Sequence, residues 1–237
     1  MEIPYITTDQ MREVDHLMIQ YFRIDLLQMM ENAGRNLAEI AKNEFFAGDS
    51  SGRKVIVLAG TGGNGGGGLA AARHLQNHGA QVTIVLATSK YGLSKTTRRQ
   101  LDILEEIGLN VVTAQSKLNF DEFDLIIDAL IGYSLTGNPE DEYASLITTA
   151  NSSNTPILSL DTPSGLDTTS GQSFNPCIRA DITMTLALPK TGFKSTTAKE
   201  YLGKLYLADI GVPPELYKMI EIEVPKNIFT QSFITKL

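Results

Sequence analysis

The feature that most constrains this chain is a glycine run, Gly60-Thr61-Gly62-Gly63-Asn64-Gly65-Gly66-Gly67-Gly68. It follows an apolar, β-branched segment at 54–59 and precedes a helix-like segment at 69–75. Glycine lets backbone N–H groups approach an anion closely, and a helix N-terminus adds unpaired donors and the positive end of a dipole. The order of strand, glycines and helix therefore predicts a phosphate or nucleotide site.

Two common nucleotide-binding fingerprints do not fit this run. No Gly-Lys-Ser or Gly-Lys-Thr follows it, which disfavours a P-loop. A dinucleotide-binding fold places an acidic residue about twenty residues on, where it holds the ribose. Here the strand expected at 81–87 ends in Ala87-Thr88. The sequence therefore predicts a Rossmann-like fold that holds its nucleotide differently.

Apolar and amphipathic segments alternate along the chain. The expected strands are 54–59, 81–87, 110–113, 124–130, 156–160, 181–187 and 204–209. The expected helices are 9–21, capped by Thr7 or Thr8, and 26–46, 67–78, 94–107 and 140–152. Nearly continuous apolar strands suit a parallel sheet covered on both faces. We predict an α/β chain: a three-layer α/β/α Rossmann-like fold with a mostly parallel central sheet and two N-terminal helices.

The ends of the chain are read in the same way. The two N-terminal helices are expected to pack on the sheet or on a partner subunit. The pair Pro213-Pro214 is expected to break regular structure before a less patterned tail that runs to Leu237. No long linker or repeat divides the chain, so 1–237 is predicted to form a single domain.

Charge and cysteine content limit the function classes. A net charge of −7 disfavours non-specific binding to nucleic acid, which needs a basic face. Cys177 is the one cysteine, so no internal disulfide is possible, and a structural thiol is favoured over a catalytic one. The segment 1–4 lacks a signal-peptide pattern, and no apolar run is long enough to span a membrane. We expect a cytoplasmic protein.

Three polar segments follow expected strands. They are the glycine run with Asn64, then Asp128 with 132–137, and then 161–167. Ligands of open parallel sheets bind beyond the carboxyl ends of the strands. Convergence at one edge of the sheet therefore predicts a shared site. The polar stretch 164–176 is predicted to be an active-site loop.

Oxygen-bearing side chains in these segments suggest a cation site. A buried Asp128 needs partners, so it either caps loop N–H groups or binds a ligand, and Asp161 has the same alternatives. Ser164 either caps the next turn or ligates a cation. Asn64, Asp128 and Ser164 together offer hard oxygen ligands, which suit a hard cation rather than zinc. His16, His74 and His78 do not form a convincing metal-ligand set.

Several motifs in order give the chain a family resemblance over about 5–215. They are Met11-Arg12-Glu13-Val14-Asp15, Met30-Glu31-Asn32-Ala33-Gly34, the glycine run, Asp128-Ala129-Leu130-Ile131-Gly132, 161–167, Leu188-Pro189-Lys190-Thr191-Gly192 and Ala208-Asp209-Ile210-Gly211. The chain resembles the stand-alone YjeF N-terminal domain, the NAD(P)H-hydrate epimerases. That resemblance implies an isomerase that interconverts the R and S forms of NADH or NADPH hydrated at C6, so that a separate dehydratase can repair the S form.

The resemblance also implies residue roles. One potassium ion per subunit would be held by Asn64, Asp128 and Ser164, and the protein would form a homodimer. Substrate contacts would come from Gly63, Asn64, Gly65, Gly66, Gly67, Gly132, Tyr133, Ser134, Leu135, Thr136, Gly137, Asn138 and Asp161. Epimerisation at C6 needs a group that protonates the departing hydroxyl and deprotonates returning water. Asp161 is the first choice for that catalytic acid and base.

The glycine run departs from the form GPGNNGGDG that is typical of this family. Thr61 stands in place of proline, Gly63 in place of asparagine and Gly67 in place of aspartate. The middle loop resembles the form GFSFKG, with Thr136 in place of lysine. These departures leave an alternative open: a catalytically degenerate domain that binds a nucleotide or a protein partner, or that serves in dimerisation.

Overall fold

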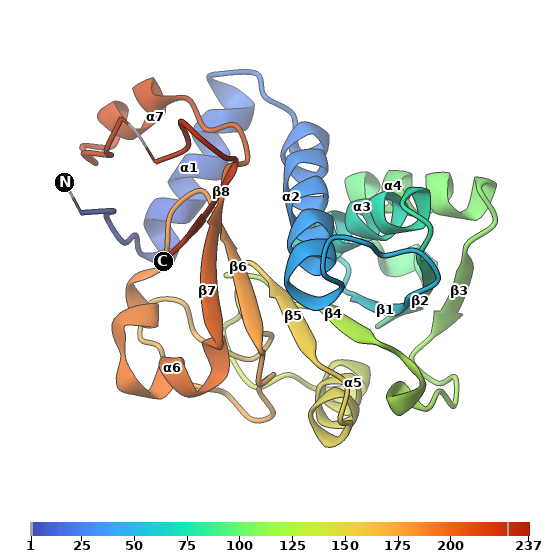
Figure 1. Ribbon diagram of the computed structural model, residues 1–237. Coiled ribbons are helices and arrows are strands. Elements are labelled where there is room, and N and C mark those ends of the chain that lie inside the picture. Colours follow the sequence, from blue (N-terminus) through green and yellow to red (C-terminus); the bar gives the residue numbers. More distant parts are fainter. Residues whose placement is uncertain (1, 227) are drawn as a thin grey trace.

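The computed structural model describes residues 2–226 and 228–237, so Met1 and Asn227 lie outside the described residues. Across that part of the chain, one sheet has the strand order β3-β2-β1-β4-β5-β6-β7-β8 (Figure 1). The strands are β1 Lys54–Ala59, β2 Gln81–Leu86, β3 Asn110–Thr113, β4 Leu125–Ala129, β5 Ile157–Leu160, β6 Ile182–Leu186, β7 Lys204–Ala208 and β8 Ile234–Lys236. Neighbouring strands run parallel, except that β8 pairs antiparallel with β7.

Helices cover both faces of the sheet, which confirms the predicted three-layer α/β/α fold (Figure 1). They are α1 Thr8–Gln20, α2 Leu26–Ile40, α3 Gly63–Asn77, α4 Lys95–Glu106, α5 Asp141–Ser152, α6 Thr196–Leu202 and α7 Pro214–Met219. Successive residues of β1 alternate between two apolar clusters. Val55 and Val57 pack with α2, α3 and α4, whereas Ile56 and Leu58 pack with α5. This alternation explains why the strand reads as continuously apolar.

The two N-terminal helices pack within this chain. α1 begins with a capping box, in which the Thr7 side chain accepts from Gln10 N and the Gln10 side chain accepts from Thr7 N. α1 packs against α7, and α2 packs against α3. A Cβ at Gly34 would lie 2.5 Å from the Ala70 Cβ, so glycine allows α2 and α3 to cross closely.

α3 begins at Gly63, four residues before the predicted start at 67. Glycine has a low helix propensity, about 1 kcal/mol below alanine, so the glycine run argued against a helix. Close packing outweighs that cost. A Cβ at Gly65 would lie 2.0 Å from the Gly60 carbonyl oxygen, and one at Gly68 would lie 2.4 Å from the Ala129 Cβ. Residues 63–66, which were predicted as loop, therefore form about the first turn of the helix, and Gly68 packs that helix against β4.

The C-terminal segment is more regular than predicted. Pro214 does not end regular structure but begins α7, at a position where its missing N–H costs nothing. Leu216 and Tyr217 of that helix are buried. β8 then extends the sheet beyond β7, and α6 also lacked a prediction. The expected break at Pro213-Pro214 was therefore wrong, whereas the described residues 220–226 and 228–233 carry no helix or strand, as a less patterned tail would.

The strand order indicates at which edge of the sheet a ligand would bind. The chain moves outward from β1 to β2 and β3, and then returns to the other side of β1 with β4. Loops that follow β1 and β4 therefore diverge at this switch point and leave a crevice beyond their carboxyl ends. Within the described residues, no helix has both the length and the apolar character needed to cross a membrane.

Candidate active site

A cavity of about 990 Å³ opens at this edge of the sheet. Its walls come from α1, α2, the start of α3, the segment after β4 and the end of β5. Of the substrate contacts predicted from the sequence, the lining includes Gly63, Asn64, Gly67, Gly132, Tyr133, Ser134, Leu135, Asn138 and Asp161. It does not include Gly65, Gly66, Thr136 or Gly137. Gly65 and Gly66 are instead buried in the helix, against Gly60 and Met30.

The start of α3 presents backbone N–H donors to this cavity. Gly62 is the N-cap and offers no side chain to the helix. The first helical bond runs from Gly66 N to Gly62 O at 3.1 Å, which leaves the N–H groups of residues 63–65 without an acceptor inside the helix. Gly63 and Asn64 line the cavity. These donors and the helix dipole favour a phosphate group here.

The three predicted cation ligands meet at one segment, 130–132. The Asn64 side chain lies against Gly132, whose Cβ position would be 3.5 Å from Asn64 Oδ1. The Leu130 N–H donates to Asp128 Oδ1 at 3.3 Å, and the Ile131 N–H donates to Ser164 Oγ at 2.9 Å. Residues far apart in sequence are therefore neighbours, as the sequence predicted.

Asp128 is a buried carboxylate surrounded by neutral donors. Its oxygens accept from Ser164 Oγ at 2.6 Å, Ser164 N at 2.9 Å and Ser159 Oγ at 2.8 Å, in addition to Leu130 N. No ion pair to Asp128 is found among the described residues. Burial raises the pKa of this carboxyl, and the bonds from Ser164 and Ser159 lower it. The capping alternative is therefore observed, and the negative charge still lacks a counter-charge.

Asp161 directly follows the next strand, β5, and its surroundings differ from those of Asp128. It is 4% exposed, and its φ of +66° puts a non-glycine residue in the left-handed region, which costs about 1–3 kcal/mol. Asp161 N donates to Met184 O at 2.7 Å, which fixes that conformation. Lys190 Nζ donates to Asp161 Oδ1 at 2.8 Å. Strained backbone held in place beside a cavity is typical of a functional residue.

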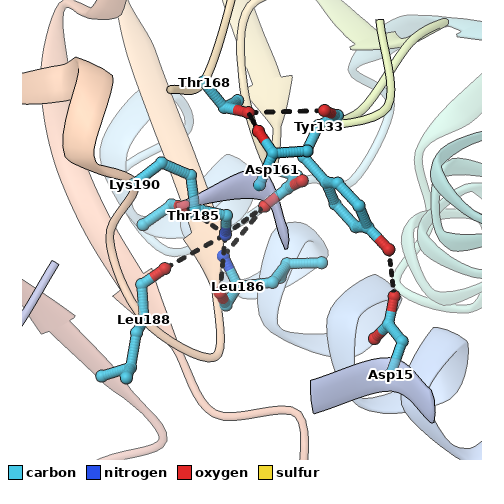
Figure 2. A network of polar contacts seen from close by, with 9 residues as sticks. Asp15, Tyr133, Asp161, Thr168, Thr185, Leu186, Leu188 and Lys190 are labelled. Carbon is cyan, nitrogen blue, oxygen red and sulfur yellow. Dashed lines mark hydrogen bonds and ion pairs between the residues drawn. The ribbon is translucent and has the colours of Figure 1, made fainter. Parts of the chain in front are cut away.

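Lys190 is a site residue that the sequence analysis did not single out. It is fully buried, and its ammonium also donates to Thr185 Oγ1 at 3.1 Å, Leu186 O at 2.9 Å and Leu188 O at 3.1 Å (Figure 2). Ile6 holds this segment, because Ile6 N donates to Pro189 O and Thr191 N donates to Ile6 O, both at 2.8 Å. The sequence placed Lys190 in the motif 188–192 but gave it no role, and its contact with Asp161 is visible only in the structure.

Asp15 and Tyr133 form a second polar pair on the cavity wall. The Tyr133 hydroxyl donates to Asp15 Oδ2 at 2.5 Å, and both residues line the cavity (Figure 2). Burial raises the pKa of Asp15, while the bond from Tyr133 lowers it. Burial also raises the pKa of Tyr133, and the Asp15 charge raises it further. Asp15 belongs to a motif quoted from the sequence, but nothing local indicated that it meets a residue 118 positions away.

The loop predicted over 164–176 supports the site from outside. None of its residues lines the cavity. Thr168 Oγ1 instead lies 2.7 Å from Thr8 Oγ1 and donates to Tyr133 O at 3.4 Å. The loop thus fastens α1 to the segment that carries Tyr133.

The remaining sequence candidates lie elsewhere. His74 Nε2 is 3.4 Å from Glu31 Oε2, and burial lowers the pKa of this imidazole. Burial raises the pKa of the Cys177 thiol to about 12, which fits a structural thiol. No cluster of three histidine, cysteine or acidic side chains suited to a metal occurs in the described part of the chain.

Fold and cavity together define a Rossmann-like α/β protein with unpaired backbone donors at a helix N-terminus and buried carboxylates beside it. The family model described as "YjeF-related protein N-terminus" matches residues 26–192, and the chain belongs to this family. α1 and its Asp15 lie before the matched segment.

Similar proteins agree with this assignment. An NAD(P)H-hydrate epimerase of Dehalogenimonas lykanthroporepellens is 45% identical over 98% of this chain and 92% of its own length. A bifunctional NAD(P)H-hydrate repair enzyme of Moorella thermoacetica is 33% identical over 89% of this chain, which spans 41% of that relative. The crystal structure of the yeast protein YNL200c superposes with a TM-score of 0.83 at 24% identity, covering 99% of this chain and 100% of that one. That structure shares the fold.

Proposed function

We propose that this protein is an NAD(P)H-hydrate epimerase, an isomerase that interconverts the R and S forms of NADH and NADPH hydrated at C6. The observation that carries the proposal is a buried, strained Asp161 beside an anion-binding helix start in one cavity. The 45% identical relative with the same named activity supports it. The N–H groups at 63–65 hold the pyrophosphate, and the hydrated ring lies toward Asp161.

Asp161 takes part in the proton transfers. The C6 hydroxyl takes a proton and leaves as water, the ring nitrogen stabilises the resulting cation as an iminium, and water then adds to the other face and releases one proton. A carboxylate positioned at the ring contributes about 10²–10⁴-fold to such steps. Lys190 holds the Asp161 carboxylate in a single orientation through the 2.8 Å ion pair.

A potassium ion is part of the proposal, with Asn64, Asp128 and Ser164 as its ligands. One feature supports the fit, which is that the Asp128 carboxylate is buried and has no ion-pair partner among the described residues. Amide and carboxylate oxygens suit a hard cation. When bound, the cation supplies positive charge near the phosphates.

The alternative of a degenerate binding domain rests on the glycines at 63 and 67. The structure offers a packing reason for Gly67, because a Cβ there would lie 2.8 Å from Leu160 Cδ2. Leu160 fills the space that a larger residue at 67 would need. The cavity also retains its acidic residue, which favours the enzyme.

The test is R-to-S interconversion of NADHX and NADPHX, coupled to a dehydratase that consumes only the S form. Wild type and Asp161→Ala are compared with and without potassium. Potassium-dependent turnover that is lost in the variant supports the proposal. A folded wild type without turnover rules it out and leaves the binding domain.

We also propose a partner enzyme, an assembly state and a location for this activity. A separate dehydratase consumes the S form, and the single-chain repair enzyme of Moorella is described as bifunctional. We expect a cytoplasmic homodimer. Sedimentation velocity measures the assembly, and fractionation of cells measures the location.

A further inference from the structure

Epimerisation at C6 requires proton transfer at both faces of the ring. The carbon changes configuration only if the hydroxyl leaves from one face and water adds to the other. A carboxylate fixed beside a ring that does not turn over reaches one face. The cavity therefore requires a second group that exchanges protons, and this requirement rests on the proposed function.

Asp161 is fixed to one wall. Its carboxylate receives Lys190 Nζ at 2.8 Å and Leu186 N at 3.4 Å, both from the side of β6. The ammonium of Lys190 has acceptors for all three of its N–H groups. These bonds hold the ion pair of Lys190 and Asp161 in one orientation. Asp161 would therefore approach the substrate from one side only, at the carboxyl end of β5.

Asp15 and Tyr133 reach the same cavity from other elements. Asp15 comes from α1, and Tyr133 comes from the segment between β4 and α5. Figure 2 shows Lys190 on one side of Asp161 and the Tyr133 phenol, with Asp15 at its hydroxyl, on the other. The two sites are close enough that the Asp161 charge raises the pKa of Asp15 and of Tyr133.

We propose that Tyr133 and Asp15 form a second proton-transfer group, which serves the ring face opposite Asp161. In one direction Asp15 starts as the carboxylic acid and donates to the Tyr133 oxygen, so that the departing hydroxyl takes the Tyr133 proton and leaves as water while Asp15 reprotonates Tyr133. The C6–O bond breaks with its electron pair on oxygen. Water then adds to the other face and gives its proton to the Asp161 carboxylate. The reverse direction exchanges the two roles, and no oxidant or reductant is needed.

The surroundings of Asp15 suit a group that must hold a proton. Burial raises the pKa of this carboxyl, which increases its protonated fraction near neutral pH. Asp15 contacts the hydroxyl of Tyr133, and Thr168 Oγ1 donates to the backbone carbonyl of Tyr133. The pair therefore combines a fixed position with an available proton, as general acid catalysis requires.

The experiment separates bond breaking from inversion. Each purified epimer is incubated in water enriched in oxygen-18, and mass spectrometry follows label at C6 in the unchanged epimer and in its opposite. The variants are Asp15→Asn, which keeps an oxygen acceptor for Tyr133, and Tyr133→Phe. Glu13→Gln is the matched control, because it makes the same change as Asp15→Asn at an exposed position of the same helix.

We expect inversion to fall about 10²-fold or more in Asp15→Asn and Tyr133→Phe. One epimer continues to exchange its hydroxyl with retention, because Asp161 still serves that face. Glu13→Gln behaves as wild type. If exchange and inversion fall by the same factor in both epimers, or if neither falls, the second group is ruled out. A wild type that inverts neither epimer removes the proposed function itself, which is a different result.

Discussion

Asp128 and Asp161 lie near the carboxyl ends of neighbouring strands but have opposite surroundings. Asp128 is in β4, and Asp161 directly follows β5, at the same edge of the sheet. Both are buried. Neutral serine and backbone groups surround Asp128, whereas the buried ammonium of Lys190 contacts Asp161.

This difference gives the two carboxylates different proposed roles. A buried carboxylate that has only neutral donors lacks a counter-charge, which the proposed potassium ion would supply. A carboxylate already paired with an ammonium does not need one, and it keeps an oxygen for substrate. The partner of each carboxylate, rather than its own position, therefore decides its proposed role.

The largest expected effect comes from Asp161→Asn. Epimerisation should fall about 10²–10⁴-fold, because an amide cannot exchange the proton. The coupled assay with NADHX measures it. Glu122→Gln, an exposed change of the same kind, serves as control and should leave the rate unchanged. A rate within a factor of two of wild type would contradict the role of Asp161.

Lys190→Met should lower the free energy of unfolding by about 3–5 kcal/mol, because it leaves the Asp161 charge buried and unpaired. Urea titration followed by circular dichroism measures the loss. Combining Lys190→Met with Asp161→Asn should restore part of the stability but none of the activity. An unchanged urea midpoint in the single variant would mean that the ion pair does not stabilise the fold.

Asp128→Asn should lower the free energy of unfolding by about 1–3 kcal/mol. The reason is that the NH₂ group of the new asparagine would face a donor that bonds a carboxylate oxygen of Asp128 in the wild type. The variant should also lose the response to potassium. Wild type should melt at a higher temperature in potassium chloride than in sodium chloride at equal ionic strength. Equal melting temperatures of wild type in the two salts would refute a potassium site at Asp128.

Thr185→Val should have the smallest effect. It removes one of four acceptors around Lys190 Nζ, and three remain for three N–H groups. The expected loss is below about 1 kcal/mol, with activity near that of wild type. Thermal unfolding and the coupled assay measure both. A loss as large as that of Lys190→Met would show that the hydroxyl, rather than Asp161, is the main partner of the lysine.

Local pattern predicted much of the fold. Each strand of the parallel part of the sheet lies within two residues of its predicted range, because apolar runs between turns are a strong local signal. α3, α6, α7 and β8 were misplaced or missed. Close packing at Gly65 and Gly68 allows a glycine-rich helix, and pairing with β7 makes a strand of Ile234–Lys236. Both depend on contacts with distant residues.

Residue order alone indicates that Asp128 and Asp161 lie near the ends of apolar strands and that Asn64 follows another strand within the glycine run. The groups that these side chains contact depend on how the elements pack. Lys190 meets Asp161 because β6 lies beside β5, and Asp15 meets Tyr133 because α1 folds back over the cavity. Apolar periodicity indicates which helices and strands form. The order of the strands in the sheet decides which loops lie at the same edge, and the proposed site is built from the loops that meet at one such edge.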